Sequence, residues 1–131
     1  VNVFFELNAY LAKMMQNLKQ YRVSIEEIHH TQKLDAPSGT AITLAEGIIK
    51  NTEYKDWKLD TAEDGEIPIT AKRIDDVPGT HTITYNSKVD DIEIKHTAHS
   101  REGFALGAVV AAEWIIGKKG VFTMKNVLNL G

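Results

Sequence analysis

The stretch that decides the fold is RVSIEEIHHTQKLDAPSGTAITLAEGII, residues 22–49, which predicts a strand, a loop and a helix in direct succession. Its first nine residues have the β-branched content and the length of a strand. Because side chains alternate along a strand, His29 shares a face with Val23 and Ile25, although the two intervening glutamates blur the pattern. The neighbouring His30 falls on the other face, so the two histidines are expected to point in different directions.

The helix of this stretch is expected to begin at Ser38, after a loop over residues 31–38. Ser38 is a good N-cap residue, preceded by Pro37 and followed by Gly39 and Thr40 in the first turn. Apolar residues then recur at the spacing of one helical face, at Ala41, Leu44, Ala45, Ile48 and Ile49.

Three more strands are predicted, at residues 67–74, 80–87 and 91–100. Residues 75–79 link the first two and residues 87–90 link the last two, and such short links favour antiparallel neighbours. The polar segment 51–66 is interpreted as a surface excursion because it is broken by turn-forming residues.

Two further helices are predicted, over residues 3–19 and 104–117. The second carries a single charge, Glu113, and a helix that is apolar nearly all round must be covered on more than one side. Residues 120–131 are interpreted as a short appended segment. The chain opens on Val1 directly before an amphipathic pattern, which is typical of a piece of a longer protein.

Composition places the chain among ordinary globular domains. It has 131 residues, 43% of them hydrophobic and 25% charged. A net charge of -3 gives no basic footprint for nucleic acid, and no apolar run is long enough to span a membrane. The absence of cysteine excludes disulfide scaffolds and thiolate metal sites. Without a signal peptide, a cytoplasmic location is expected.

The loop and helix start carry the residues suited to chemistry. Unpaired amide donors at a helix N-terminus attract an anion such as a carboxylate, and Gly39 allows a ligand to approach the backbone. Lys33 and the histidines could share that pocket and supply protons near neutral pH. A helix start alone usually does no more than cap the helix.

Other residues of this kind have simpler interpretations. Asp35 is expected to organise the loop by bonding to backbone amides. A zinc site is disfavoured because adjacent histidines on a strand diverge and no HExxH motif or cysteine is present. Three histidines, His81, His96 and His99, are expected to be structural or interfacial. Arg101 is either a second anion clamp or a solvated charge, and the second interpretation is favoured.

The run HHTQKLDAPSGTA, residues 29–41, resembles the signature of dihydrodipicolinate reductase, also called 4-hydroxy-tetrahydrodipicolinate reductase. Ile28 departs from it, because many members carry a small residue there. Residues 79–85, GTHTITY, and the segment HTAHSREGFALGAVVAAEWI resemble further family motifs, as does the closing VFTMKNVLNL. The likeness covers nearly the whole chain.

This resemblance implies a role for individual residues. His29 and Lys33 would be catalytic as proton carriers, and His30, Ser38, Gly39 and Thr40 would bind the substrate. In the family, NADPH or NADH delivers hydride to a cyclic dicarboxylate in lysine and diaminopimelate biosynthesis, and the product anion is then protonated. An ammonium suits that last step because it both stabilises and quenches the developing charge.

The resemblance also implies the architecture and the partners. Residues 1–131 would be the C-terminal substrate-binding and tetramerisation domain, an α+β unit with an open mixed, largely antiparallel sheet and helices on one face. Four copies would associate through their sheets. No GxGxxG follows a strand here, so the Rossmann cofactor domain is expected to be absent, no cofactor-binding residue is expected, and the fragment alone is expected to be inactive.

Two alternatives remain open at this point. The chain could be a purely structural homo-oligomerisation module whose histidines and lysine only support a loop. Metal-dependent hydrolysis is the second alternative. Neither a membrane nor a nucleic acid is expected as a partner.

Overall fold

The computed structural model describes residues 1–100, 102–118, 120 and 122–130, with the backbone alone for residues 102–107. Five strands form one open sheet in the order β2-β3-β1-β4-β5. Their bounds are Arg22–His29 for β1, Asp56–Leu59 for β2, Glu66–Arg73 for β3, Gly79–Asn86 for β4 and Asp91–Ala98 for β5. β1 is parallel to β3 and antiparallel to β4, while β2 is parallel to β3 and β5 antiparallel to β4. The predicted α+β fold with an open mixed sheet is confirmed.

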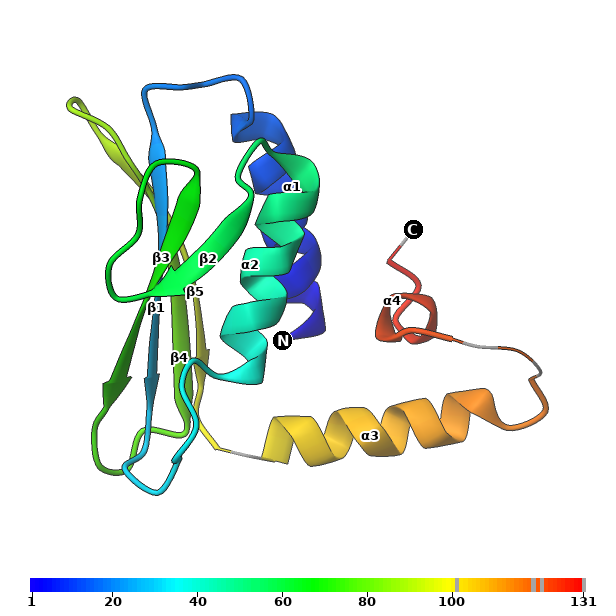
Figure 1. Ribbon diagram of the computed structural model, residues 1–131. Coiled ribbons are helices and arrows are strands. Elements are labelled where there is room, and N and C mark those ends of the chain that lie inside the picture. Colours follow the sequence, from blue (N-terminus) through cyan, green and yellow to red (C-terminus); the bar gives the residue numbers. More distant parts are fainter. Residues whose placement is uncertain (101, 119, 121, 131) are drawn as a thin grey trace.

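Two helices, α1 (Asn2–Met15) and α2 (Gly39–Asn51), cover one face of this sheet (Figure 1). The core between the layers is aliphatic and includes Ile25, Ile67, Ile69 and Ile83 from the strands and Leu44 and Ile48 from α2. The two helices are also joined by a hydrogen bond, since the buried Asn8 donates from Nδ2 to the Leu44 carbonyl at 2.9 Å. The one-sided helix layer therefore leaves the other face of the sheet without a cover from the described helices.

The prediction that β3 and β4 are antiparallel neighbours is wrong. β1 lies between them and pairs with both. Two strand spacings amount to about 10 Å, which a five-residue link at about 3.3 Å per residue can span. The link over residues 74–78 therefore passes the end of β1 instead of forming a hairpin. The second link does form the expected hairpin between β4 and β5.

The polar segment 51–66 is not wholly a surface excursion, because it contains β2. This four-residue edge strand pairs with β3 in parallel, and Trp57 packs against the core while its neighbours stay exposed. One inward side chain in a charged strand gives too weak an alternation to be recognised from sequence.

The C-terminal helices lie apart from the sheet in Figure 1. α3 (Glu102–Ile115) is followed by the short α4 (Met124–Val127), and the rings of Trp114 and Phe122 meet edge to face at 4.8 Å. Apolar side chains of this region are exposed, with Val109 at 52% and Ile116 at 78%. Among the described residues α3 is therefore not covered on more than one side, contrary to the prediction made from its composition. No helix in the described part of the chain has the length and hydropathy required to cross a bilayer.

Candidate functional site

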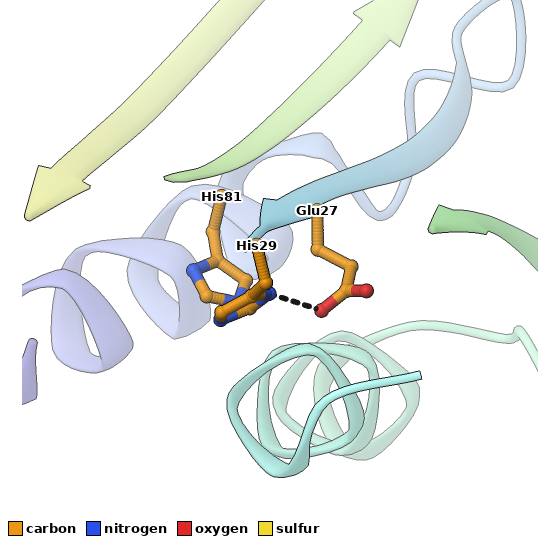
Figure 2. Close-up of side chains that lie close together, drawn as sticks. All are labelled: Glu27, His29 and His81. Atoms are coloured by element: carbon orange, nitrogen blue, oxygen red, sulfur yellow. Dashed lines mark ion pairs between the residues drawn. The ribbon is translucent and has the colours of Figure 1, made fainter. Parts of the chain in front are cut away.

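The candidate site lies at the carboxyl end of β1, on the face covered by helices. Alternation along β1 brings Glu27 and His29 to this face, and Figure 2 shows both beside His81 of β4. The Glu27 side chain is 0% exposed. Its Oε2 lies 2.8 Å from Nδ1 of His29, off the direction of an in-line hydrogen bond, so the contact is electrostatic. A buried carboxylate needs such partners, because an uncompensated charge is costly to bury.

Both oxygens of Glu27 accept hydrogen bonds from other elements. The backbone N–H of Ser38, at the start of α2, donates to Oε2 at 3.2 Å. Arg73, at the end of β3, donates from Nη1 to Oε1. Burial would raise the pKa of Glu27, but these hydrogen bonds and the neighbouring charges of His29 and Arg73 hold it below its usual value. Glu27 is therefore an anion that joins β1, β3 and α2.

Ser38 caps α2 as predicted. Its Oγ accepts the backbone N–H of Ala41 at 3.1 Å and lies 3.0 Å from Nε2 of His81. Since the hydroxyl oxygen already accepts from Ala41, the arrangement that satisfies both groups has Ser38 donating its proton to His81. Ser38 is 2% exposed, so its hydroxyl is committed to the protein.

The loop that carries Lys33 is tied down by Arg73. The guanidinium donates from Nε to the Lys33 carbonyl at 3.2 Å and from Nη2 to the Asp35 carbonyl at 2.6 Å. Lys33 Nζ lies 3.2 Å from Oδ1 of Asp35, and this bond with Lys33 lowers the pKa of the Asp35 carboxyl. One arginine thus connects the lysine loop to the buried Glu27.

The two histidines that face each other in this site favour the neutral form. Their rings meet edge to face with centroids 5.1 Å apart. Burial, together with the neighbouring His29, lowers the pKa of His81 to about 4. Burial also lowers the pKa of His29, although Glu27 acts in the opposite direction. A Cβ on Gly79 would lie only 3.1 Å from Nε2 of His29, so a larger residue at this position would crowd the ring where β4 passes it.

The structure brings most of the predicted site residues to one place. His29 and Ser38 both contact Glu27, and Arg73 joins this carboxylate to the backbone of Lys33. Gly39 and Thr40 form the first turn of α2, and a Cβ on Gly39 would meet nothing within 4 Å. His30 lies just beyond β1, and its carbonyl accepts the N–H of Lys33 at 3.2 Å.

Sequence reasoning missed four residues of this arrangement: Glu27, Arg73, Gly79 and His81. Glu27 precedes His29 by two positions, so strand alternation alone could have placed both on one face. Arg73 comes from a neighbouring strand and carried no local signal, whereas Gly79 and His81 lie in the GTHTITY stretch that resembles a family motif. His81, which was expected to be structural or interfacial, has a structural contact, because it is bonded to the residue that caps α2. Among the other candidates, the His96 ring lies tilted against Phe4 with centroids 5.6 Å apart, His99 is exposed, and Arg101 lies outside the described residues.

Ligand atoms of Glu27, His29 and His81 lie within 4.8 Å of one another, which is a spacing compatible with a cation. The surroundings do not fit one. Both Glu27 oxygens already accept N–H donors, one from a guanidinium, and His81 is bonded to Ser38. The positive charge of Arg73 opposes a second cation there. These three residues therefore form part of a network of hydrogen bonds and ion pairs with Ser38 and Arg73.

A cleft of about 420 Å³ lies at the opposite end of β1. It is lined by, among others, Met15, Leu18, Val23, Tyr54, Pro68 and Tyr85. The lysine and arginine at its rim are each paired, Lys19 with Glu53 and Arg22 with Asp64. These paired charges leave the cleft without an evident attraction for an anion, unlike the start of α2.

Comparisons with known proteins agree with one another. A family model described as dihydrodipicolinate reductase, C-terminus, matches residues 1–128. A 4-hydroxy-tetrahydrodipicolinate reductase of Christiangramia forsetii is 66% identical over 130 residues, covering 98% of this chain and 54% of the relative. One of Methanosarcina mazei is 44% identical over 135 residues, covering 99% and 50%. The chain thus spans about half the length of these curated relatives.

A solved structure also resembles the fold. It is a dipicolinate-bound dihydrodipicolinate reductase from Paenisporosarcina sp. TG-14, with a TM-score of 0.64 and 25% sequence identity. The match covers 93% of this chain and 51% of the solved chain.

Proposed function

This chain belongs to the dihydrodipicolinate reductase family, and we propose that it is the substrate-binding and oligomerisation domain of a 4-hydroxy-tetrahydrodipicolinate reductase. The observation that carries the proposal is the bond between Ser38 and Glu27, which fixes the α2 N-terminus beside His29. An anion-binding helix start and a proton carrier therefore share one corner of the fold.

The ligand proposed for this corner is a cyclic dicarboxylate. One carboxylate would accept hydrogen bonds from the amides of Gly39 and Thr40, where the open space beside Gly39 lets it approach. The rings of His29 and His81 are neutral, so they place no negative charge beside the ligand carboxylate. Ser38 contributes to the pocket by holding the turn, because its hydroxyl is already engaged. We retain His30 as a contact of the ligand on the strength of the family resemblance.

Proton transfer is assigned to Lys33 and His29. The Lys33 side chain is 23% exposed and its ammonium pairs with the largely exposed Asp35, so Lys33 would exchange one anionic partner for another when the ligand binds. Lys33 then donates a proton to the reduced ring, a step for which a positioned group contributes about 10² to 10⁴ in rate. Hydride addition takes up only one proton in all, so His29 is proposed to donate or accept this same proton in exchange with its surroundings.

The described residues do not fit a dinucleotide. The one strand-loop-helix unit with an anion-binding turn runs through Asp35, Pro37 and Ser38 and lacks the glycine-rich turn that a pyrophosphate requires. NADH or NADPH would therefore supply its hydride from the half of the relatives that this chain does not match. The exposed apolar side chains of α3 support a contact with that half.

A homotetramer in the cytoplasm, acting in lysine and diaminopimelate biosynthesis, completes the proposal. The face of the sheet away from α1 and α2 supports an association of sheets, because no described helix packs on it. The assembly itself is proposed from the family resemblance.

The test of the ligand site is a titration of the ¹⁵N-labelled chain with dipicolinate, followed through the amide signals of Gly39 and Thr40. We expect these signals to shift and Lys33→Ala to abolish the shift, whereas the control Lys50→Ala, in the last turn of α2, leaves it intact. Signals that stay unchanged at millimolar dipicolinate would favour the alternative, a purely structural homo-oligomerisation module.

The test of the activity is a chimaera in which the unmatched half of the Christiangramia forsetii relative precedes this chain. Oxidation of NADH or NADPH that depends on the cyclic substrate is expected for the chimaera and not for the chain alone. A chimaera that folds, binds dipicolinate and oxidises neither nucleotide would contradict the assignment.

A further inference from the structure

We infer that Glu27 is a positioning residue, which holds the ring of His29, the first turn of α2 and, through Arg73, the backbone that carries Lys33 in one fixed arrangement. Its consequence for catalysis rests on the proposed function. The structural role of Glu27, in which one buried carboxylate sets the geometry and the charge around His29, does not depend on the proposed function.

The contacts of Glu27 support this role because they come from separate parts of the fold. Its two oxygens meet Nδ1 of His29 in β1, the N–H of Ser38 at the start of α2, and Nη1 of Arg73 in β3. None of these distances exceeds 3.2 Å. A side chain that is 0% exposed, accepts two hydrogen bonds and contacts a third group has little freedom to reorient.

Arg73 extends this hold to the catalytic loop. It is the register partner of His29 in the parallel pairing of β1 with β3, so its side chain lies on the same face. Its planar guanidinium reaches Glu27 and the carbonyls of Lys33 and Asp35 at once. A lysine at this position could not match that fork of donors.

The adjacent ion pair of Glu26 and Lys72 shows how the buried pair of Glu27 and Arg73 differs from an exposed pair. These residues occupy the preceding positions of the same two strands, and their ion pair is 2.9 Å long. Their side chains are 40% and 50% exposed. Arg73 donates to the Lys72 backbone carbonyl at 2.9 Å, but no hydrogen bond among the described residues joins the Glu26 or Lys72 side chain to the site. Exposed pairs of this kind contribute little to stability. Glu26 and Lys72 therefore serve as an internal control.

The charges around His29 explain why a carboxylate is needed. Arg73 from β3 and Lys33 from the loop face it as cations, and His81 faces it from β4. Burial and both cations lower the pKa of His29, and Glu27 is the group that raises it. Removing the negative charge of Glu27 would remove the one group that raises the pKa of His29 while Arg73 and Lys33 remain, so His29 would hold a proton less readily.

The experiment compares Glu27→Gln with Glu26→Gln in the ligand-free chain, following the His29 ring by NMR as a function of pH. We expect Glu27→Gln to lower the pKa of His29 below that of the wild-type chain, and Glu26→Gln to leave it unchanged. Equal His29 titration in the wild-type chain and a folded Glu27→Gln variant would overturn the inference. If dipicolinate fails to bind the wild-type chain while this difference appears, the proposed function fails and the positioning role stands.

A second variant keeps the test decisive if Glu27→Gln does not fold. Arg73→Lys retains the charge beside Glu27 but loses the bonds to the Lys33 and Asp35 carbonyls. In the active chimaera we expect Arg73→Lys to lower kcat by roughly 10²-fold, the typical effect of misplacing a catalytic group by about 1 Å. Unchanged amide signals for residues 33–35 together with wild-type kcat would overturn the role of Arg73.

Discussion

Nε2 of His81 lies 3.0 Å from Oγ of Ser38, so a histidine of β4 holds the residue that caps α2. The start of the helix is thereby fixed to the sheet by a side-chain bond as well as by packing. The orientation of the amides at the start of α2, and with it any anion site there, depends on this buried pair.

Replacing Ser38 by alanine removes the cap of Ala41 and leaves His81 without its partner. Loss of an N-cap and of a buried hydrogen bond should together lower the free energy of unfolding by about 2 kcal/mol or more. Urea unfolding of Ser38→Ala, compared with that of the separate variant Thr43→Ala, measures this loss in free energy of unfolding. Thr43 is exposed and bonds only within α2, so its variant is expected to stay within about 0.5 kcal/mol of wild type. Equal effects of the two substitutions would contradict the buried link.

The buried His81 makes stability depend on pH. Its pKa is lowered from 6.5 to about 4 in the folded chain, so between these values the unfolded chain binds the proton more readily. The free energy of unfolding should therefore fall by roughly 3 kcal/mol as the pH drops from about 6.5 to about 4. Above about pH 6.5, His81 contributes no further pH dependence.

The matching measurement is urea unfolding across that pH range for the wild-type chain, His81→Gln and the exposed control His99→Gln. We expect a shallower pH dependence for His81→Gln and an unchanged one for His99→Gln. Protonation of Glu27, whose pKa is also lowered, costs further stability only as the pH falls through its folded pKa, below its usual 4.5. A wild-type slope in His81→Gln would be incompatible with a buried neutral ring.

Gly79→Ala should displace the His29 ring. The added Cβ would lie 3.1 Å from Nε2 and 3.3 Å from Cδ2 of His29, and overpacking of this kind costs about 1–3 kcal/mol. Urea unfolding gives the cost, and the NMR signals of His29 give the displacement. An alanine variant with wild-type stability and unchanged His29 signals would show that the ring has room to spare.

Gly39→Ala should separate folding from binding. Its Cβ would meet nothing within 4 Å, and alanine in a compatible helical position stabilises a protein by about 0.4–1 kcal/mol. The same methyl group would stand in the path of a carboxylate approaching the first turn. We expect unchanged or higher stability and a weakening of dipicolinate binding of about tenfold, equivalent to about 1.4 kcal/mol. Unaltered affinity, measured by calorimetry, would place the ligand elsewhere.

Local patterns were sufficient to predict most of the fold. The alternation in β1, the spacing of apolar residues in α2 and the N-cap Ser38 each depend on neighbours in sequence, and the structure has all three. The strand order was beyond such patterns. Short links suggested that β3 and β4 pair, but the insertion of β1 between them is decided by long-range packing. β2 was missed because Trp57 alone marks its inner face.

The candidate site was predictable where its residues lie within one segment. The motif from His29 to Thr40 contains the histidines, the lysine and the helix start. Arg73 and His81 join it only through pairing between strands, which no single-sequence pattern specifies. Glu27 could have been predicted, because a charged residue on an apolar strand face costs free energy to bury unless a buried partner compensates its charge.

The central position of β1 determines which part of the molecule can move. This strand is hydrogen-bonded on both sides, to β3 and to β4, so displacing its end would break two ladders at once. His29 and Glu27 therefore lie on a strand that is held in place on both sides. If water is to be excluded around a bound ring, the movement must come from a part of the protein other than β1.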